Sequence, residues 1–460
     1  MSSAILVPII AAMAIWPFGR NKDDTEGTIR ELEEVEVAVE TSGTLDGSEQ
    51  KAIESYREFL ELASEDPLLR AEAMRRLADL QLETVDGDQF AADSAVLGSD
   101  AGSTVTLYEQ LLASYPGYEK RDLVLYQLAR AHEAAGRTDA ALDTLDRLVA
   151  EYPATAHIDE AHFRRGEILF VDQRYRESED AYALVLAFGP DSNFYEQSLY
   201  KQGWAQFKQA RHEDSLLPFF GLLDRRFRVD ADVPVDPADL YVEMGRAEQE
   251  LIDDTLRVVS IGFSYMEGPE SITAHFRDIG SRPYAYVVYT HLGDLYIDQE
   301  RYQDAADAYR AFVELDPYHA RAPFLAAEVI EAYGEGGFAD LVLEGKREFV
   351  EVYGPDSPYW AAFTYEEQPE VVALLKTNLT DLAAWHHSLA QETGNIEDYR
   401  QAARWYRSYL QSFPNEPESA GTNFLLAEVL FESRSFDAAA REYERTAYAY
   451  PLHERSAEAG

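Results

Sequence analysis

Carboxylate side chains gather in the stretch ETVDGDQFAADSAVLGSDAGS, residues 83–103, and carboxylate oxygens are ligands that Ca²⁺ prefers. The stretch supplies Asp86, Asp88, Asp93 and Asp100. It lacks the spacing of an EF-hand loop and a glutamate at the required downstream position. Its Gly, Ser and Asp content favours a long, flexible acidic loop without a metal.

The sequence also contains no motif for a histidine metal site or for nucleophilic catalysis. His386 and His387 are adjacent, and adjacent residues of a helix point about 100° apart, so the pair would not chelate one ion together. The sequence has no G-x-G-x-x-G, no P-loop, no H-E-x-x-H and no G-x-S-x-G. We therefore expect no catalytic residue, no metal and no cofactor, and a protein that is not an enzyme.

The charge balance narrows the class of partner. Among 460 residues, 85 are acidic and 40 are basic, which leaves a net charge of -45, and there is no cysteine. Such a surface repels nucleic acid phosphates and anionic lipid headgroups, so a nucleic acid is not an expected partner. The acidic excess either attracts cationic proteins or serves solubility in a salty environment.

The N-terminus, MSSAILVPIIAAMAIWPFGRNKDD, contains an apolar run from Ala4 to Phe18. This run is short for a membrane-spanning helix, which needs about 20 residues, and residues 12–14 form an A-x-A cleavage pattern. We expect residues 1–22 to be a signal peptide and 23–46 a disordered linker, which would place the protein in the periplasm or cell envelope. No Lys or Arg precedes the run, so a retained membrane anchor and a cytosolic protein stay as alternatives.

Prolines recur at a fixed interval of 37 residues: Pro116, Pro153 and Pro190, and later Pro414 and Pro451. The cleanest unit, residues 286–317, reads YVVYTHLGDLYIDQERYQDAADAYRAFVELDP. Each half carries apolar residues on one helical face, and the proline ends the second half. Two such helices cannot bury their apolar stripes alone, so the pattern predicts hairpins that stack on one another.

Seven units share three columns of residues. They start at Asp122, Asp159, Glu196, Tyr286, Ala320, Ala383 and Ala420. The eighth position is always small: Ala129, Gly166, Gly203, Gly293, Ala327, Ala390 and Ala427. The twentieth is also small: Ala141, Ser178, Ser215, Ala305, Ala339, Ala402 and Ala439. The twenty-fourth is large: Leu145, Tyr182, Phe219, Tyr309, Leu343, Tyr406 and Tyr443. Because two helices approach closely only over small side chains, the small columns predict where each hairpin crosses.

This pattern resembles the tetratricopeptide repeat (TPR), from about residue 47 to 460 with gaps. The phrases HFRRGEILF, YKQGWAQFKQ and GKREFVEVYG are further similar to those of long bacterial cell-envelope TPR proteins of the BamD and YbgF type. The resemblance implies an all-α fold, a right-handed superhelical solenoid of antiparallel helix hairpins. It also implies a non-catalytic scaffold that binds peptide or helical segments of cell-envelope proteins in its concave groove.

Residues 228–285 fit no unit, although DTLRVVSIGFSYMEG and ESITAHFRDIG read as short amphipathic helices. We therefore expect an N-terminal arm at 47–252, an irregular helical hinge at 253–283 and a C-terminal arm at 284–460 that stops within a repeat. A functional part beyond residue 460, served by these repeats as a substrate-recruiting arm, is one alternative function. A cytosolic TPR regulator is the other.

The resemblance also points to a binding surface, because the family places the fifth and twelfth positions of each first helix on the concave groove. Aromatic residues stand there at Tyr126, Phe163, Phe170, Tyr200, Phe207, Phe324, Phe424 and Phe431. Such a ladder would bind a partner through apolar area and ring stacking, unless neighbouring units bury the rings as core. The ninth position is mostly acidic or neutral, so a groove that clamps a carboxylate is not expected.

Overall fold

The computed structural model describes residues 46–62, 66–88, 94–229, 236–451 and 454–460, and every regular element in these ranges is a helix. The predicted signal peptide (1–22) and linker (23–46) lie outside the described residues, apart from Asp46, which begins the first helix. Within the described ranges, no helix is both long enough and apolar enough to cross a membrane.

The helices of the first part, in chain order, are α1 (Asp46–Glu61), α2 (Pro67–Asp88), α3 (Ser94–Ser114), α4 (Arg121–Ala134), α5 (Thr138–Glu151), α6 (Ile158–Val171), α7 (Tyr175–Leu186), α8 (Tyr195–Lys208), α9 (His212–Arg226) and α10 (Pro237–Glu243). The remainder are α11 (Arg246–Ser264), α12 (Pro269–Ile279), α13 (Ala285–Asp298), α14 (Tyr302–Leu315), α15 (Ala322–Glu335), α16 (Ala339–Tyr353), η1 (Pro358–Ala361), α17 (Pro369–Thr393), α18 (Ile396–Ser412), α19 (Ser419–Glu432), α20 (Phe436–Tyr448) and α21 (Ser456–Ala459).

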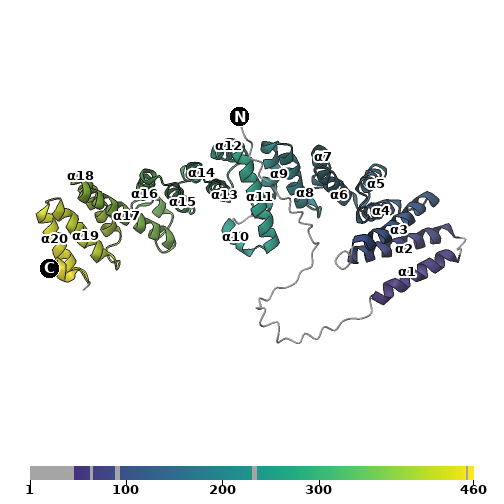
Figure 1. Ribbon diagram of the computed structural model, residues 1–460, viewed down its shortest axis with the longest axis horizontal. Coiled ribbons are helices and arrows are strands. Elements are labelled where there is room, and N and C mark those ends of the chain that lie inside the picture. Colours follow the sequence, from purple (N-terminus) through teal and green to yellow (C-terminus); the bar gives the residue numbers. More distant parts are fainter. Residues whose placement is uncertain (1–45, 63–65, 89–93, 230–235, 452–453) are drawn as a thin grey trace.

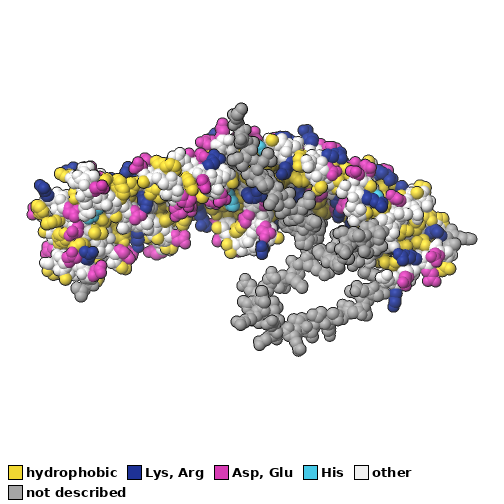
Figure 2. Space-filling view, viewed as in Figure 1, with side chains coloured by type: hydrophobic (Ala, Val, Ile, Leu, Met, Phe, Trp, Pro, Cys, Tyr) yellow, Lys and Arg dark blue, Asp and Glu magenta, His cyan; other side chains and the backbone are white. Residues whose placement is uncertain are grey.

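These helices stack in chain order into an elongated, curved array, with α1 near one end and α20 at the other (Figure 1). Each of the seven predicted units forms a hairpin whose two helices pack together, from α4 with α5 to α19 with α20. On the face shown in Figure 2, acidic and basic side chains are interspersed with apolar ones along the whole array. The prediction of an all-helical TPR-like array is confirmed.

The small columns lie where the hairpins are tightest. A Cβ added at Gly166 would stand 2.5 Å from a ring carbon of Tyr182, and one at Gly203 would stand 2.7 Å from the ring of Phe219. The Ser178 hydroxyl donates to the Gly166 carbonyl at 2.9 Å, which ties the twentieth position to the eighth. In these two hairpins the ring of the twenty-fourth position thus lies on the glycine of the eighth, where an added Cβ would collide with it.

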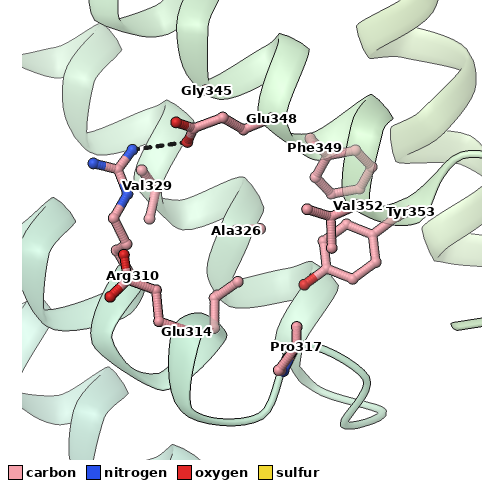
Figure 3. A pocket seen from close by; sticks show the side chains of 11 residues that line it. Arg310, Glu314, Pro317, Ala326, Val329, Gly345, Glu348, Phe349, Val352 and Tyr353 are labelled. Carbon is pink, nitrogen blue, oxygen red and sulfur yellow. Dashed lines mark hydrogen bonds and ion pairs between the residues drawn. The ribbon is translucent and has the colours of Figure 1, made fainter. Parts of the chain in front are cut away.

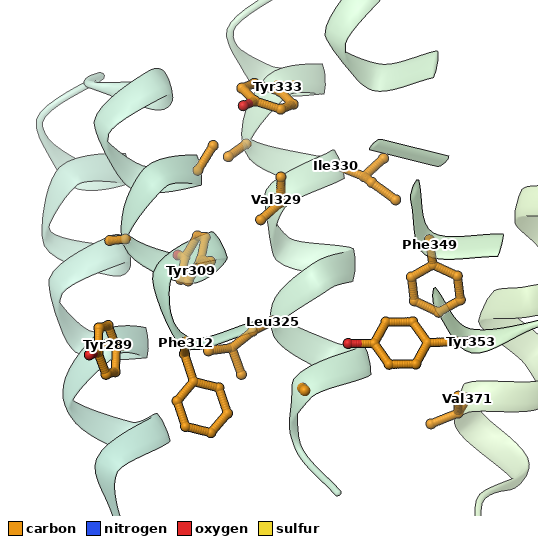
Figure 4. Packing of buried hydrophobic residues seen from close by; sticks show 14 of the residues in the cluster. Tyr289, Tyr309, Phe312, Leu325, Val329, Ile330, Tyr333, Phe349, Tyr353 and Val371 are labelled. Carbon is orange, nitrogen blue, oxygen red and sulfur yellow. The ribbon is translucent and has the colours of Figure 1, made fainter. Parts of the chain in front are cut away.

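Aromatic rings also dominate the packing between hairpins (Figure 4). Buried side chains from Leu216 to Ala439 form one hydrophobic cluster, and those from Ala71 to Ala181 form another. Each cluster spans several units because a hairpin buries its second face only against its neighbours.

Continuous helices pack between the two expected arms. The boundary expected between residues 252 and 253 falls inside α11, whose apolar face packs against α9 and α13. Phe227, which stands where other units have the closing proline, is buried and stacks on Tyr284 with ring centroids 4.9 Å apart. The two amphipathic helices expected here are present as α11 and α12, and α10 is an additional short helix.

The long acidic loop predicted over residues 83–103 is wrong. Helix α2 continues to Asp88 and α3 begins at Ser94, so helices cover most of this stretch. Glycine, serine and aspartate weaken a helix by only about 0.5 to 1 kcal/mol each, and tertiary packing outweighs that cost. Here Ala101 and Tyr108 of α3 are completely buried, and the Tyr108 hydroxyl donates to Asp79 of α2 at 2.7 Å.

Candidate protein-binding surface

The first helices of the units carry the predicted groove residues, and their fifth positions contact the following unit. The Tyr126 ring stacks on His157, with centroids 4.3 Å apart and planes 7° apart. Phe163 stacks on Phe194 at 5.1 Å, and the Arg455 guanidinium lies 5.0 Å from the ring centroid of Phe424. His157, Phe194 and Arg455 each stand just before the first helix of the next unit.

This contact decides how much of each ring is available. Tyr126 is 6% exposed and Phe424 is 4% exposed, so these two rings present almost no surface to a partner as they stand. Phe163 and Phe324 are half-buried. At the fifth position, an aromatic ring therefore joins one unit to the next.

The twelfth-position rings form a different and repeated arrangement. Each pairs edge to face with the seventeenth residue of its own unit, across the turn between the two helices. The pairs are Phe170 with Tyr175 (5.3 Å), Phe207 with His212 (4.9 Å) and Phe431 with Phe436 (5.4 Å between centroids). Phe431 and Phe436 are 53% and 56% exposed, which makes this pair an aromatic surface at the last full hairpin. The seventeenth column was missed from the sequence, although aromatic residues recur there.

Helix α11 covers part of the same face in the unit that begins at Glu196. The Tyr200 hydroxyl donates to Asp254 of α11, and Tyr265, just beyond the end of α11, lies 6.4 Å from the Phe207 ring. Tyr200 and Phe207 are accordingly half-buried, whereas Tyr265 is 65% exposed. A helix of the chain itself therefore contacts the ladder here.

Acidic residues of the ninth position have an internal partner, the tyrosine of the twenty-fourth. The Tyr309 hydroxyl donates to Asp294 at 2.7 Å, and Tyr443 donates to Glu428. The same bond joins Tyr182 to Glu167. Burial and the adjacent carboxylate both raise the pKa of Tyr182, so this hydroxyl stays protonated.

Ion pairs run between consecutive first helices on this surface. Arg164 bonds to Glu133 of the preceding unit and to Glu160, at 2.8 Å each. Burial raises the pKa of Glu133, against the lowering effect of Arg164. Lys201 bonds to Glu167 at 2.9 Å. These pairs neutralise part of the acidic charge and fix the spacing between units.

The adjacent histidines point to different partners, as expected. His387 lies 3.1 Å from Glu432, while His386 lies 3.5 Å from Asp398. In the part of the chain that the structure describes, no group of three His, Cys, Asp or Glu side chains is arranged to hold a metal ion.

Comparisons with known proteins agree with this geometry. Residues 105–156, 126–193, 290–335 and 388–454 match the tetratricopeptide repeat family model. A comparison with curated protein sequences gives no match.

Several solved structures are similar at low identity. A Podosopora anserina protein with nearly identical TPR-like repeats is 13% identical, with a TM-score of 0.30, over 48% of this chain and 95% of that chain. A chain of the Naa15/Naa10 structure bound to HypK-THB is 12% identical, with a TM-score of 0.33, over 87% of this chain and 58% of its own. Pseudomonas aeruginosa PilF is 16% identical, with a TM-score of 0.24, over 53% and 97%.

Proposed function

We propose that this chain is a non-catalytic scaffold that binds peptide or helical segments of cell-envelope proteins along the inner face of its first helices. Tetratricopeptide repeats generally serve as protein-interaction scaffolds, because stacked hairpins present an extended surface. The observation that carries the proposal is the exposed Phe431–Phe436 pair, which lies in the same register as Phe170 and Phe207. Aromatic rings supply large contact area with little loss of side-chain entropy.

The net charge shapes the choice of partner. With a net charge of -45, the scaffold favours segments in which basic residues flank an apolar or aromatic anchor. Long-range attraction of this kind raises the association rate and weakens with added salt, because the Debye length is about 8 Å at physiological ionic strength.

The test is capture of partners from an envelope extract with the full chain as bait. The double variant Phe431→Ala with Phe436→Ala should lose partners that the wild type retains. Helicity and melting temperature should stay unchanged, because both rings are more than half exposed. Leu217→Ala is the matched control, since Leu217 is 73% exposed on α9 and lies outside the ladder. Equal capture by the double variant and the wild type would contradict the proposal.

A second pair of substitutions asks how far the ladder extends. Phe163→Ala with Phe170→Ala should also reduce capture. Phe163 packs on Phe194 and on Tyr182, so this variant must be checked by melting temperature as well. If binding and fold are lost together, Phe163 and Phe170 belong to the core and not to the partner surface.

Placement in the periplasm or cell envelope is part of the proposal and rests on the N-terminal sequence. Cleavage after Ala14 would create a mature protein that begins at Ile15. Mass spectrometry of the N-terminus of the native protein tests this. An intact Met1 in a cytosolic fraction would contradict export and favour a cytosolic regulator.

A further inference from the structure

A pocket of about 360 Å³ opens between α14, α15 and α16, and no residue of the aromatic ladder lines it (Figure 3). Its walls are mostly apolar and include Val313, Val329 and Phe349. Pockets of this size suit a small molecule, and an apolar wall with one or two polar groups is their usual construction.

The pocket exists because one unit lacks a side chain that others have. The seventh position is leucine in four units: Leu128, Leu292, Leu389 and Leu426. In the unit that begins at Ala320 this position is Ala326, which lines the pocket. Replacing leucine by alanine leaves space that neighbouring helices fill only in part. Here the space is open to the surface, and Ala326 is itself only half-buried.

Tyr353 contributes a hydroxyl group to the mostly apolar wall of the pocket. Its side chain is 0% exposed, and within the described part of the protein its hydroxyl has no hydrogen-bond partner. Figure 3 shows the hydroxyl directed from α16 towards the interior of the pocket, near Pro317 and Ala326. Burial raises the pKa of Tyr353, so the hydroxyl is protonated and can donate a hydrogen bond. A buried hydroxyl without a partner is costly, and an acceptor on a bound molecule would remove that cost.

The charges at the rim favour an uncharged ligand. Arg310 bonds to Glu348 at 3.0 Å and also donates to the Tyr333 hydroxyl at 3.2 Å, so its charge is already used within the protein. Glu314 adds a further carboxylate to the rim, which disfavours anions. A cation would have to leave water for apolar walls, where an ionised group is expensive to bury.

We propose that this pocket binds a small, uncharged, mainly apolar molecule that carries one hydrogen-bond acceptor, with Tyr353 as the donor. The apolar body fills the volume left by Ala326, and the acceptor atom meets the Tyr353 hydroxyl. This site is separate from the inner-face surface and does not depend on it.

Two probes of nearly equal shape test the proposal: acetophenone, which has a carbonyl acceptor, and ethylbenzene, which has none. Saturation-transfer NMR titrations with the full chain should show saturable binding of both, with acetophenone about fivefold tighter, as one net hydrogen bond provides. In Tyr353→Phe the two probes should bind equally. In Ala326→Leu, which restores the residue of four other units, neither probe should bind.

Ala326→Leu should melt at or above the wild-type temperature because the leucine enters existing space, so loss of binding will not reflect unfolding. Absence of saturable binding by either probe to the wild type would overturn the proposal. So would equal affinities in the wild type, or full binding by Ala326→Leu. If the wild type binds neither probe and Ala326→Leu loses partner capture, the pocket takes a side chain of a protein and not a free small molecule.

Discussion

The contact between Gly293 and Tyr309 offers the sharpest test of how the hairpins close. A Cβ at Gly293 would lie within 2.7 Å of three ring carbons of Tyr309, whereas ordinary carbon contacts are about 3.5 to 4.0 Å. The ring cannot move freely, because Tyr309 is 1% exposed and its hydroxyl donates to Asp294 at 2.7 Å. Gly293→Ala must therefore displace the ring or push α14 away from α13.

The expected cost follows from three effects. Overpacking of a dense core costs about 1 to 3 kcal/mol. Disturbing the bond from Tyr309 to Asp294 costs about 1 to 2 kcal/mol, since the acceptor is a carboxylate. Replacing glycine by alanine inside a helix gains about 1 kcal/mol. The net loss in the free energy of unfolding is about 1 to 4 kcal/mol for Gly293→Ala.

Urea unfolding followed by circular dichroism measures the change, and hydrogen exchange should locate it in α13 and α14. Exchange is needed because long repeat arrays do not always unfold in one step. Gly334→Ala is the matched control: Gly334 lies in α15 and a Cβ there would meet nothing within 4 Å. That variant should be stabilised by about 0.5 to 1 kcal/mol.

The reasoning fails if Gly293→Ala is as stable as the wild type while Gly334→Ala shows its gain. A second substitution adds a further check. Gly293→Ala with Tyr309→Leu reproduces the Ala129 and Leu145 pair of another unit, and it should recover part of the lost stability. No recovery would mean that the collision is not between these two positions.

Three other predictions test individual parts of the array. Burial lowers the pKa of His162 from 6.5 to about 4. The unfolded chain therefore takes up a proton that the folded chain refuses, and stability is lost as the pH falls from 6.5 to 4. His162→Gln should reduce this acid-induced loss, measured by urea unfolding at several pH values. Arg75 is 4% exposed and bonds to Glu72 and Asp79. Arg75→Met should therefore lower the free energy of unfolding by about 2 to 3 kcal/mol and speed hydrogen exchange in α2. Unchanged exchange would refute this. Ala210 has φ 59°, a left-handed conformation that glycine adopts more easily than alanine. Ala210→Gly should therefore raise the melting temperature, by an amount equivalent to about 1 kcal/mol. A lower melting temperature would show that this turn is not strained.

Periodicity predicted the contacts that recur in every unit. The small columns at positions eight and twenty predicted where the helices of a hairpin cross, and Ser178 is hydrogen-bonded to Gly166 there. The columns did not show that the large side chain at position twenty-four, Tyr182, lies on Gly166 of its own hairpin. A repeated pattern reveals such contacts because seven units sample the same geometry with different side chains. The two positions that must stay small then appear as two columns of small residues.

Other contacts within a hairpin depend on side-chain geometry between its two helices, and the columns alone did not reveal them. The pairing of Tyr309 with Asp294 is one example, and the ring pair of Phe431 and Phe436 is another. A signal was present in the first case: Tyr182, Tyr309 and Tyr443 each have an acidic residue fifteen positions earlier. For the partner surface, the sequence could place rings on one helical face but could not show that the next unit covers Tyr126 and Phe424.

The remaining difference arose where no repeat guided the prediction. Residues 83–103 were expected to be a loop because their local preferences oppose a helix, yet buried side chains such as Tyr108 hold α3 in place. Likewise, α11 has no template among the units, so its extent across residue 252 was not foreseen.

The continuity of α11 has a practical consequence for anyone who wishes to divide this chain. A cut after residue 252 would sever a helix whose side chains Leu256, Val259 and Phe263 are at most 1% exposed. The amino-terminal piece would lose the helix that covers α9. The carboxy-terminal piece would begin with a partly unfolded helix end whose apolar side chains are exposed to solvent. Neither fragment would stay dispersed in water.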